Sequence, residues 1–117
     1  MSFQPEPRVD YRDAVGVVSF TGELDLLQAH ALRNRLLGAV RNEDLGLVVD
    51  LSAATYIDSV GVSLLFELAE RLSARQLRLA VVVPEEGVVE RALTIVNLAS
   101  VAEVQRTLDD ALAAIES

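Results

Sequence analysis

The sequence predicts an α/β fold, with a mixed, mostly parallel β-sheet of four to five strands and about four helices. Short runs rich in Val alternate along the chain with longer segments in which apolar residues recur at helical spacing. This alternation indicates crossover connections, which build a parallel sheet covered by helices. Since 51% of the 117 residues are apolar, a core can form without metal or disulfides, and we expect one domain over residues 1–117.

The N-terminal segment predicts a hairpin followed by a helix. We expect strands at 9–13 and 14–22, which are separated by a short polar turn and therefore pair antiparallel. The helical period runs from Asp25 to about residue 42, and the Asp25 carboxylate lies where it can accept from free amide groups. The inner face of this helix is expected to carry Ala29, Leu32, Leu36, Ala39 and Val40.

The central segment predicts two further strands around a second helix. The run LGLVVDL at 45–51 is apolar throughout, as in a strand buried on both faces of a parallel sheet. Residues 52–58 are expected to form a loop, and a helix follows from residue 59 to about residue 74. A strand at 76–83 then ends at Pro84.

The C-terminal segment completes the order β-β-α-β-α-β-α-β-α. A helix is expected at 85–98, then a short edge strand at 101–105 and a last amphipathic helix at 107–116 with Thr107 as its N-cap. The inner face of the first of these helices is expected to carry Val89, Ala92, Leu93 and Val96.

Composition restricts the partners. The net charge is −8 and all ten basic residues are Arg, so we expect no direct binding to nucleic acid. Cysteine is absent, which agrees with a reducing compartment. The first ten residues do not resemble a secretory signal, and the longest apolar runs are too short to span a bilayer. We therefore expect a cytoplasmic protein with no membrane insertion.

Catalytic groups are scarce, so we expect no enzyme activity, cofactor or metal. His30 is the only histidine and falls within a helix, where a surface position is the simpler interpretation. Metal sites built on His and Cys are excluded. Ser59 lacks the G-x-S-x-G pattern of serine hydrolases, and the absence of Lys excludes a P-loop. Paired carboxylates such as Glu85 and Glu86 lie near expected helix starts, where they stabilise the helix dipole.

Two polar corners, each between a strand and a helix, are the candidate site. In TYIDSVG, Asp58 or Ser59 can cap the following helix, worth about 1 kcal/mol. Gly61 costs about 1 kcal/mol inside a helix, and it lets another group approach the backbone closely. A helix start also tolerates a phosphate, so capping and modification of Ser59 both remain possible interpretations. The other corner, TGELDL, carries Glu23 and Asp25, and both corners are expected at the carboxyl end of the sheet.

GELD at 22–25 followed by YIDSVG at 56–61 resembles the STAS domain family, and the resemblance covers nearly the whole chain. It implies an anti-sigma factor antagonist that binds an anti-sigma factor, often a serine kinase of the histidine-kinase ATPase fold. The kinase phosphorylates a corner serine, which ends the binding, and a phosphatase resets the protein.

By this resemblance Ser59 is the phosphate acceptor. Val60 departs from the family pattern, which has a small hydroxyl residue there, and this leaves Ser59 as the one acceptor at the corner. The partner-binding residues implied are Glu23, Asp25, Asp58, Ser59, Val60 and Gly61. Two alternatives stay open: a STAS adaptor subunit of an ABC-type lipid transport or stress-sensing complex, and a small enzyme with Ser59 as nucleophile.

Overall fold

The computed structural model describes residues 7–24 and 26–117, except for the side chains of residues 26–28, 30 and 31. The expected α/β class and order of elements are confirmed, with one added 3₁₀ turn. The elements are β1 (Arg8–Arg12), β2 (Val15–Leu24), α1 (Leu26–Ala39), β3 (Gly46–Ile57), α2 (Ser59–Ala74), β4 (Arg78–Val82), α3 (Val88–Ile95), the 3₁₀ turn η1 (Leu98–Ser100), β5 (Glu103–Gln105) and α4 (Leu108–Glu116).

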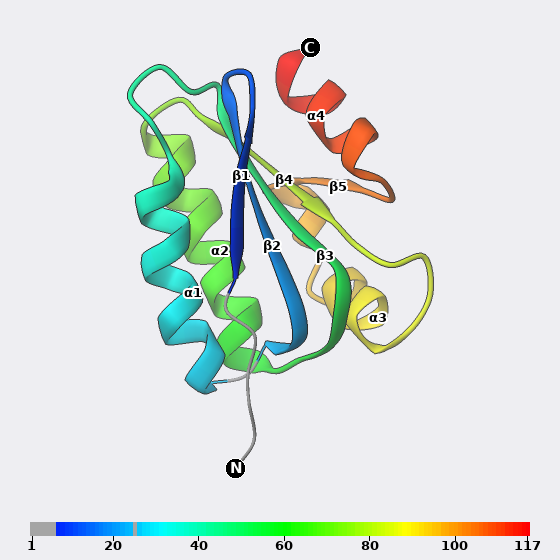
Figure 1. Cartoon of the computed structure of the whole chain (residues 1–117). Helices are drawn as coiled ribbons and strands as arrows, with labels where there is room; N and C mark the ends of the chain where they lie inside the picture. Colours follow the sequence, from blue (N-terminus) through cyan, green and yellow to red (C-terminus); the bar gives the residue numbers. More distant parts are fainter. Residues whose placement is uncertain (1–6, 25) are drawn as a thin grey trace.

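The strands form one five-stranded sheet in chain order, β1-β2-β3-β4-β5. β1 is antiparallel to β2, as the expected hairpin requires, and the other neighbours are parallel. Because crossovers between parallel strands are right-handed and the strand order never reverses, α1, α2 and α3 lie on one face of the sheet. α4 follows the last strand and covers the other face (Figure 1).

The sheet separates two apolar clusters, so its central strand is buried on both faces as expected. Val48 and Val49 are both fully buried, and they point into different clusters. The larger cluster lies under α1, α2 and α3, and its bulkiest members include Phe20, Leu32, Leu36, Leu65 and Leu68. The smaller cluster lies under α4. α4 begins after the expected cap Thr107, whose hydroxyl accepts from the Asp110 amide at 3.1 Å.

The prediction of a loop at 52–58 is wrong, because β3 continues to Ile57. β2 likewise continues to Leu24, and the two extensions pair in parallel. The register shifts twice, between Asp50 and Ala53 and between Ala54 and Tyr56, and each shift adds one residue to β3. These bulges break the alternation of buried and exposed side chains, which is why the segment resembles a loop in sequence.

The helix expected at 85–98 is shorter, since α3 spans only Val88–Ile95. It begins after Gly87, whose φ of 128° is a conformation that favours glycine. Val96, which was expected to face inward, is 38% exposed. It follows the end of α3, and Asn97 turns the chain with a φ of 57°.

The helix expected to reach residue 42 ends at Ala39, where side chains fix the connection to β3. The Asp44 side chain is 3% exposed and accepts from the Arg41 amide at 2.7 Å and from the Arg41 guanidinium at 2.9 Å. The Tyr11 hydroxyl donates to the Ala39 carbonyl at 2.9 Å, and the Arg41 guanidinium lies 3.9 Å from the centre of the Tyr11 ring. These contacts join the hairpin to the end of α1.

Candidate functional site

The two corners meet at the carboxyl end of the sheet, as the sequence predicted. Leu24 pairs with Ile57 and Glu23 with Tyr56 in the parallel ladder of β2 and β3. The Asp58 amide then donates to the Leu24 carbonyl at 3.3 Å. The ends of β2 and β3 are therefore held side by side. Asp25, also predicted for this site, lies outside the described residues.

Asp58 caps α2. Its backbone is extended, and its Oδ1 accepts from the amides of Val60 at 3.0 Å and Gly61 at 2.9 Å. Its carbonyl accepts the first helical bond, from the Val62 amide at 3.0 Å. Of the two capping residues considered from sequence, Asp58 is the one used. Its carboxylate satisfies two of the amides that a helix start leaves without a partner.

Ser59 is the first residue of α2, and it is exposed. Because Asp58 supplies the cap, the helix start does not depend on the Ser59 hydroxyl. A hydroxyl in this position is accessible to a second protein. It also lies at the end of the helix where added negative charge is best tolerated by the helix itself.

Gly61 is required by the packing of this chain. It is buried, and a Cβ at this position would lie 2.7 Å from the Leu24 carbonyl oxygen and 2.8 Å from Ile57 Cγ1. Cβ atoms essentially never come so close to other heavy atoms. The close approach that the sequence suggested is therefore made by the end of β2, which lets α2 start directly against the sheet.

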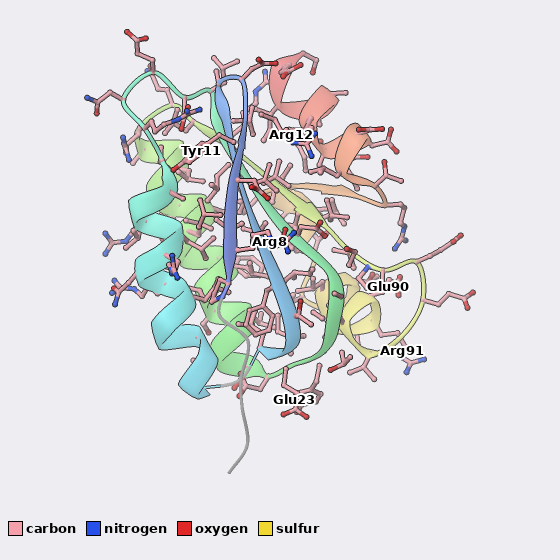
Figure 2. All side chains as sticks on the ribbon, in the orientation of Figure 1. Arg8, Tyr11, Arg12, Glu23, Glu90 and Arg91 are labelled. Atoms are coloured by element: carbon pink, nitrogen blue, oxygen red, sulfur yellow. The ribbon has the colours of Figure 1, made fainter. Side chains whose placement is uncertain are left out.

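The surface around Ser59 combines a carboxylate with apolar side chains. Glu23 is exposed, and Figure 2 shows it at the carboxyl end of the parallel strands. Tyr56 is 45% exposed and Val60 is 37% exposed. Sequence reasoning did not single out Tyr56 as a site residue. The available signal was an aromatic residue two positions before Asp58 in the corner TYIDSVG, and aromatic residues are enriched in protein interfaces.

A groove of about 270 Å³ between α1 and α2 reaches this corner at Val60. Arg33 and Glu67 lie across it, and Arg33 Nε donates to the two Glu67 carboxylate oxygens at 3.0 and 3.2 Å. Arg71 Nε lies 3.6 Å from the same carboxylate. Sequence reasoning missed this pair, since 34 residues separate its members and no local pattern indicates that α1 and α2 are neighbours.

Within residues 7–24 and 26–117, no group of three or more His, Cys, Asp or Glu side chains is arranged to hold a metal ion. In the same part of the chain, every buried side-chain nitrogen or oxygen has a hydrogen-bond partner. None of the described helices combines the length and apolar character needed to cross a bilayer.

Comparison with known proteins identifies the family. The profile of the STAS domain matches residues 6–111. The anti-sigma-F factor antagonist RsfB of Mycobacterium tuberculosis is 31% identical over 103 residues, which cover 88% of this chain and 83% of RsfB.

Solved structures of similar proteins have the same fold as this chain. An anti-sigma factor antagonist from Mycobacterium paratuberculosis is 31% identical, with a TM-score of 0.81 over 95% of this chain and 93% of that one. The phosphorylated form of the Bacillus cell fate determinant SpoIIAA shares the fold at 18% identity, with a TM-score of 0.68 over 93% of this chain and 98% of SpoIIAA. The chain described here belongs to the STAS domain family.

Proposed function

We propose that this chain is an anti-sigma factor antagonist that is switched off by phosphorylation of Ser59. It binds an anti-sigma factor that is a serine kinase of the histidine-kinase ATPase fold, and a phosphatase restores the unmodified form. It acts in the cytoplasm as a binding protein, with no catalytic residue or cofactor of its own. Two relatives at 31% identity, each named as an anti-sigma factor antagonist, support this function.

The exposure of Ser59 at the first position of α2 is the observation that carries the proposal. A kinase must reach the hydroxyl without unfolding the domain, and an exposed residue at a helix start meets that condition. The cap formed by Asp58 keeps α2 intact while a kinase binds Ser59. The hydrogen bonds from the Val60 and Gly61 amides to Asp58 do not involve the Ser59 hydroxyl, which accepts the phosphate.

Electrostatics accounts for release of the partner. A phosphate adds about 1.5 to 2 negative charges beside Asp58, at the same end of the sheet as the exposed Glu23, which pairs with Tyr56. Tyr56 and Val60 offer the apolar area that a partner would bury around Ser59. Charge placed in such a contact is both desolvated and repelled by its neighbours. A thousandfold loss of affinity requires only about 4 kcal/mol, which this charge can supply while the fold is retained.

Phosphate transfer tests the acceptor directly. The purified chain is incubated with ATP and each ATPase-fold serine kinase encoded in the same genome, and added phosphate is located by mass spectrometry. We expect one phosphate, on Ser59, and none on a Ser59→Ala variant. Ser63→Ala is the matched control, because Ser63 is also exposed and lies one turn further along α2. Transfer to Ser63, or to no residue with any of these kinases, contradicts the proposed switch.

Partner binding tests the function itself. We expect the unmodified chain and the Ser59→Ala variant to bind the anti-sigma kinase, and the Ser59→Asp variant to bind it more weakly. Equal binding by the two variants contradicts the switch. Co-purification of the chain with a transporter-type ATPase in place of a small kinase contradicts the antagonist function and favours an adaptor subunit.

A further inference from the structure

The groove of about 270 Å³ between α1 and α2 is a second candidate contact surface, next to the Ser59 corner. The two helices lie side by side on one face of the sheet (Figure 1), and they run in the same direction because they connect parallel strands. The α2 residues of the lining recur every three or four positions, which places them along one stripe of that helix. The lining consists of Ala29 and Arg33 from α1 and of Val60, Ser63, Leu64 and Glu67 from α2. We call these six residues the α1–α2 groove.

The floor of the α1–α2 groove is apolar, and an exposed aliphatic side chain stands at its edge. Ala29 is 4% exposed and Leu64 is 7% exposed, whereas Val60 is 37% exposed. Among the described side chains that pack against the larger core cluster, Val62 is included and Val60 is not. Only the backbone amide of Val60 takes part in the Asp58 cap. The Val60 side chain is therefore available for contact with another molecule.

The far end of the groove carries positive charge. Arg33 and Arg71 share the Glu67 carboxylate, with nitrogen to oxygen distances of 3.0 and 3.6 Å, so two positive charges lie beside one negative charge. The Arg71 side chain is 54% exposed, and its 3.6 Å contact is too long for a hydrogen bond. Its N–H groups can therefore still bind a carboxylate of a partner. Because the start of α2 carries Asp58 and Glu23, the surface changes from negative to positive along this helix.

The groove suits a protein side chain better than a small-molecule ligand. Sites for small molecules usually have volumes of about 300 to 1,000 Å³, and this groove is smaller. An aliphatic side chain laid over Ala29 and Leu64 would cover the exposed part of Val60 and remove it from water. An acidic residue further along the same partner is attracted by the two Arg side chains, whereas a basic one is repelled.

We propose that the α1–α2 groove receives one aliphatic side chain of the anti-sigma kinase, and that an acidic side chain of the same kinase segment binds Arg71. This inference rests on the proposed function, because its partner is the kinase that binds the Ser59 corner. The groove begins at that corner, so one segment of the kinase can contact both. The change of charge along α2 fixes the direction of this segment, with its acidic end away from Asp58. The groove thus selects the partner, and Ser59 controls its release.

The groove contact is expected to be independent of the switch. Arg71 follows Ser59 by twelve residues on α2, which corresponds to about 18 Å along the helix axis. Exposed charges separated by more than about 8 to 10 Å are largely screened at physiological ionic strength. A phosphate on Ser59 therefore has little effect on the pairing of Arg71. The factors by which the two changes weaken binding should multiply in a double variant.

Binding to a kinase tests the charged end of the groove. The probe is the ATPase-fold serine kinase, encoded in the same genome, that binds the unmodified chain most tightly, and dissociation constants are measured by calorimetry. We expect Arg71→Glu to weaken binding at least tenfold and Arg71→Gln to weaken it less. Arg12→Glu is the control with the same change in net charge, and its affinity should stay within twofold of the unmodified chain. Arg12 is exposed on β1, and Figure 2 shows it at the opposite end of the molecule from Glu23.

The apolar part of the groove is tested without a change of charge. Val60→Thr keeps the shape of the side chain and replaces one methyl group by a hydroxyl, so we expect binding to weaken at least fivefold. Val88→Thr is the control and should bind normally, because Val88 is 46% exposed in the first turn of another helix, α3. The methyl signals of Leu64 should shift when the kinase is added to the ¹³C-methyl-labelled chain. Equal binding by the two Thr variants, or unchanged Leu64 signals, overturns the proposal.

The outcomes separate the groove from the switch. If Arg71→Glu binds like Arg12→Glu while Ser59→Asp binds more weakly, the groove assignment is overturned and the switch stands. If Arg71→Glu weakens binding and Ser59→Asp does not, the groove stands and the switch is overturned. A double variant, Ser59→Asp with Arg71→Glu, that binds no more weakly than either single variant contradicts two separate contacts. Circular dichroism confirms that each variant is folded.

Discussion

Asp58, Ser59 and Gly61 have different roles at the Ser59 corner. Asp58 holds the free amides of the helix start, Gly61 allows α2 to approach Leu24, and Ser59 is left exposed between them. The roles are separable because they depend on different features of each residue. Asp58 acts through a carboxylate oxygen, Gly61 through the absence of a Cβ, and Ser59 through its hydroxyl. Substitutions at the three positions should therefore have different effects on stability and on binding.

Removal of the cap should lower stability. We expect Asp58→Ala to reduce the free energy of unfolding by about 1 kcal/mol, because the amides of Val60 and Gly61 lose their acceptor. Ser59→Ala is the control, and its change should stay within about 0.5 kcal/mol. Urea denaturation measures both. Equal losses from the two variants would show that Ser59 shares the capping role.

A side chain at Gly61 should be poorly tolerated. We expect Gly61→Ala to cost about 1 to 3 kcal/mol, because the new methyl group overlaps the Leu24 carbonyl and the Ile57 side chain. Gly38→Ala is the matched control. Gly38 also lies in a helix, but a Cβ there meets no atom within 4 Å, and Ala is the better helix former. A Gly61→Ala protein as stable as the unmodified chain would contradict the close contact.

At the scale of elements, the extension of β2 and β3 past the central sheet creates the site. Both strands continue beyond the reach of β4, whose pairing with β3 ends at Asp50. The two register shifts let β3 follow β2 to its end and deliver Asp58 beside Leu24. Bulges of this kind often lie next to functional sites, where they change the direction of a strand.

The opposite end of α1 is fixed by Asp44. We expect Asp44→Ala to lower the free energy of unfolding by about 1 to 3 kcal/mol, since it removes a buried acceptor from the Arg41 amide and guanidinium. Glu43→Ala is the control, because Glu43 is exposed in the same turn, and we expect a change within about 0.5 kcal/mol. Thermal unfolding, monitored by circular dichroism, distinguishes the Asp44→Ala variant from the Glu43→Ala variant. An equal shift in both variants contradicts a specific role for Asp44.

Sequence patterns predicted those elements whose apolar period is regular. The order of elements is confirmed for this reason, and the doubly buried strand predicted at 45–51 is confirmed from Gly46 onward, with Leu45 49% exposed before it. The cap at Thr107 is also confirmed, and it was indicated by residue type at a helix start. The segment at 52–58 was assigned wrongly, because bulges remove the period on which strand prediction depends. At the site, Ser59 and Asp58 stand out locally, whereas Arg33 and Glu67 meet only through the packing of α1 on α2. Tyr56 could be recognised as a site residue only once the structure showed that its side chain is exposed.

At the scale of the whole molecule, we expect the switch to act without refolding. Ser59 is exposed and its hydroxyl is not needed for the cap, so added charge should leave the core unaffected. Ser59→Asp should therefore keep the unfolding free energy within about 0.5 kcal/mol of the unmodified chain. A loss of several kcal/mol would mean that the corner is coupled to the core and that release of a partner follows from unfolding.

The affinity of the phosphorylated chain for its anti-sigma kinase tests the central claim most directly. Phosphoserine is introduced at position 59 during synthesis, and the dissociation constant is compared with that of the unmodified chain by surface plasmon resonance. We expect binding to weaken about a thousandfold, which corresponds to about 4 kcal/mol. Equal affinity of the two forms for the same kinase would contradict a switch based on charge at Ser59.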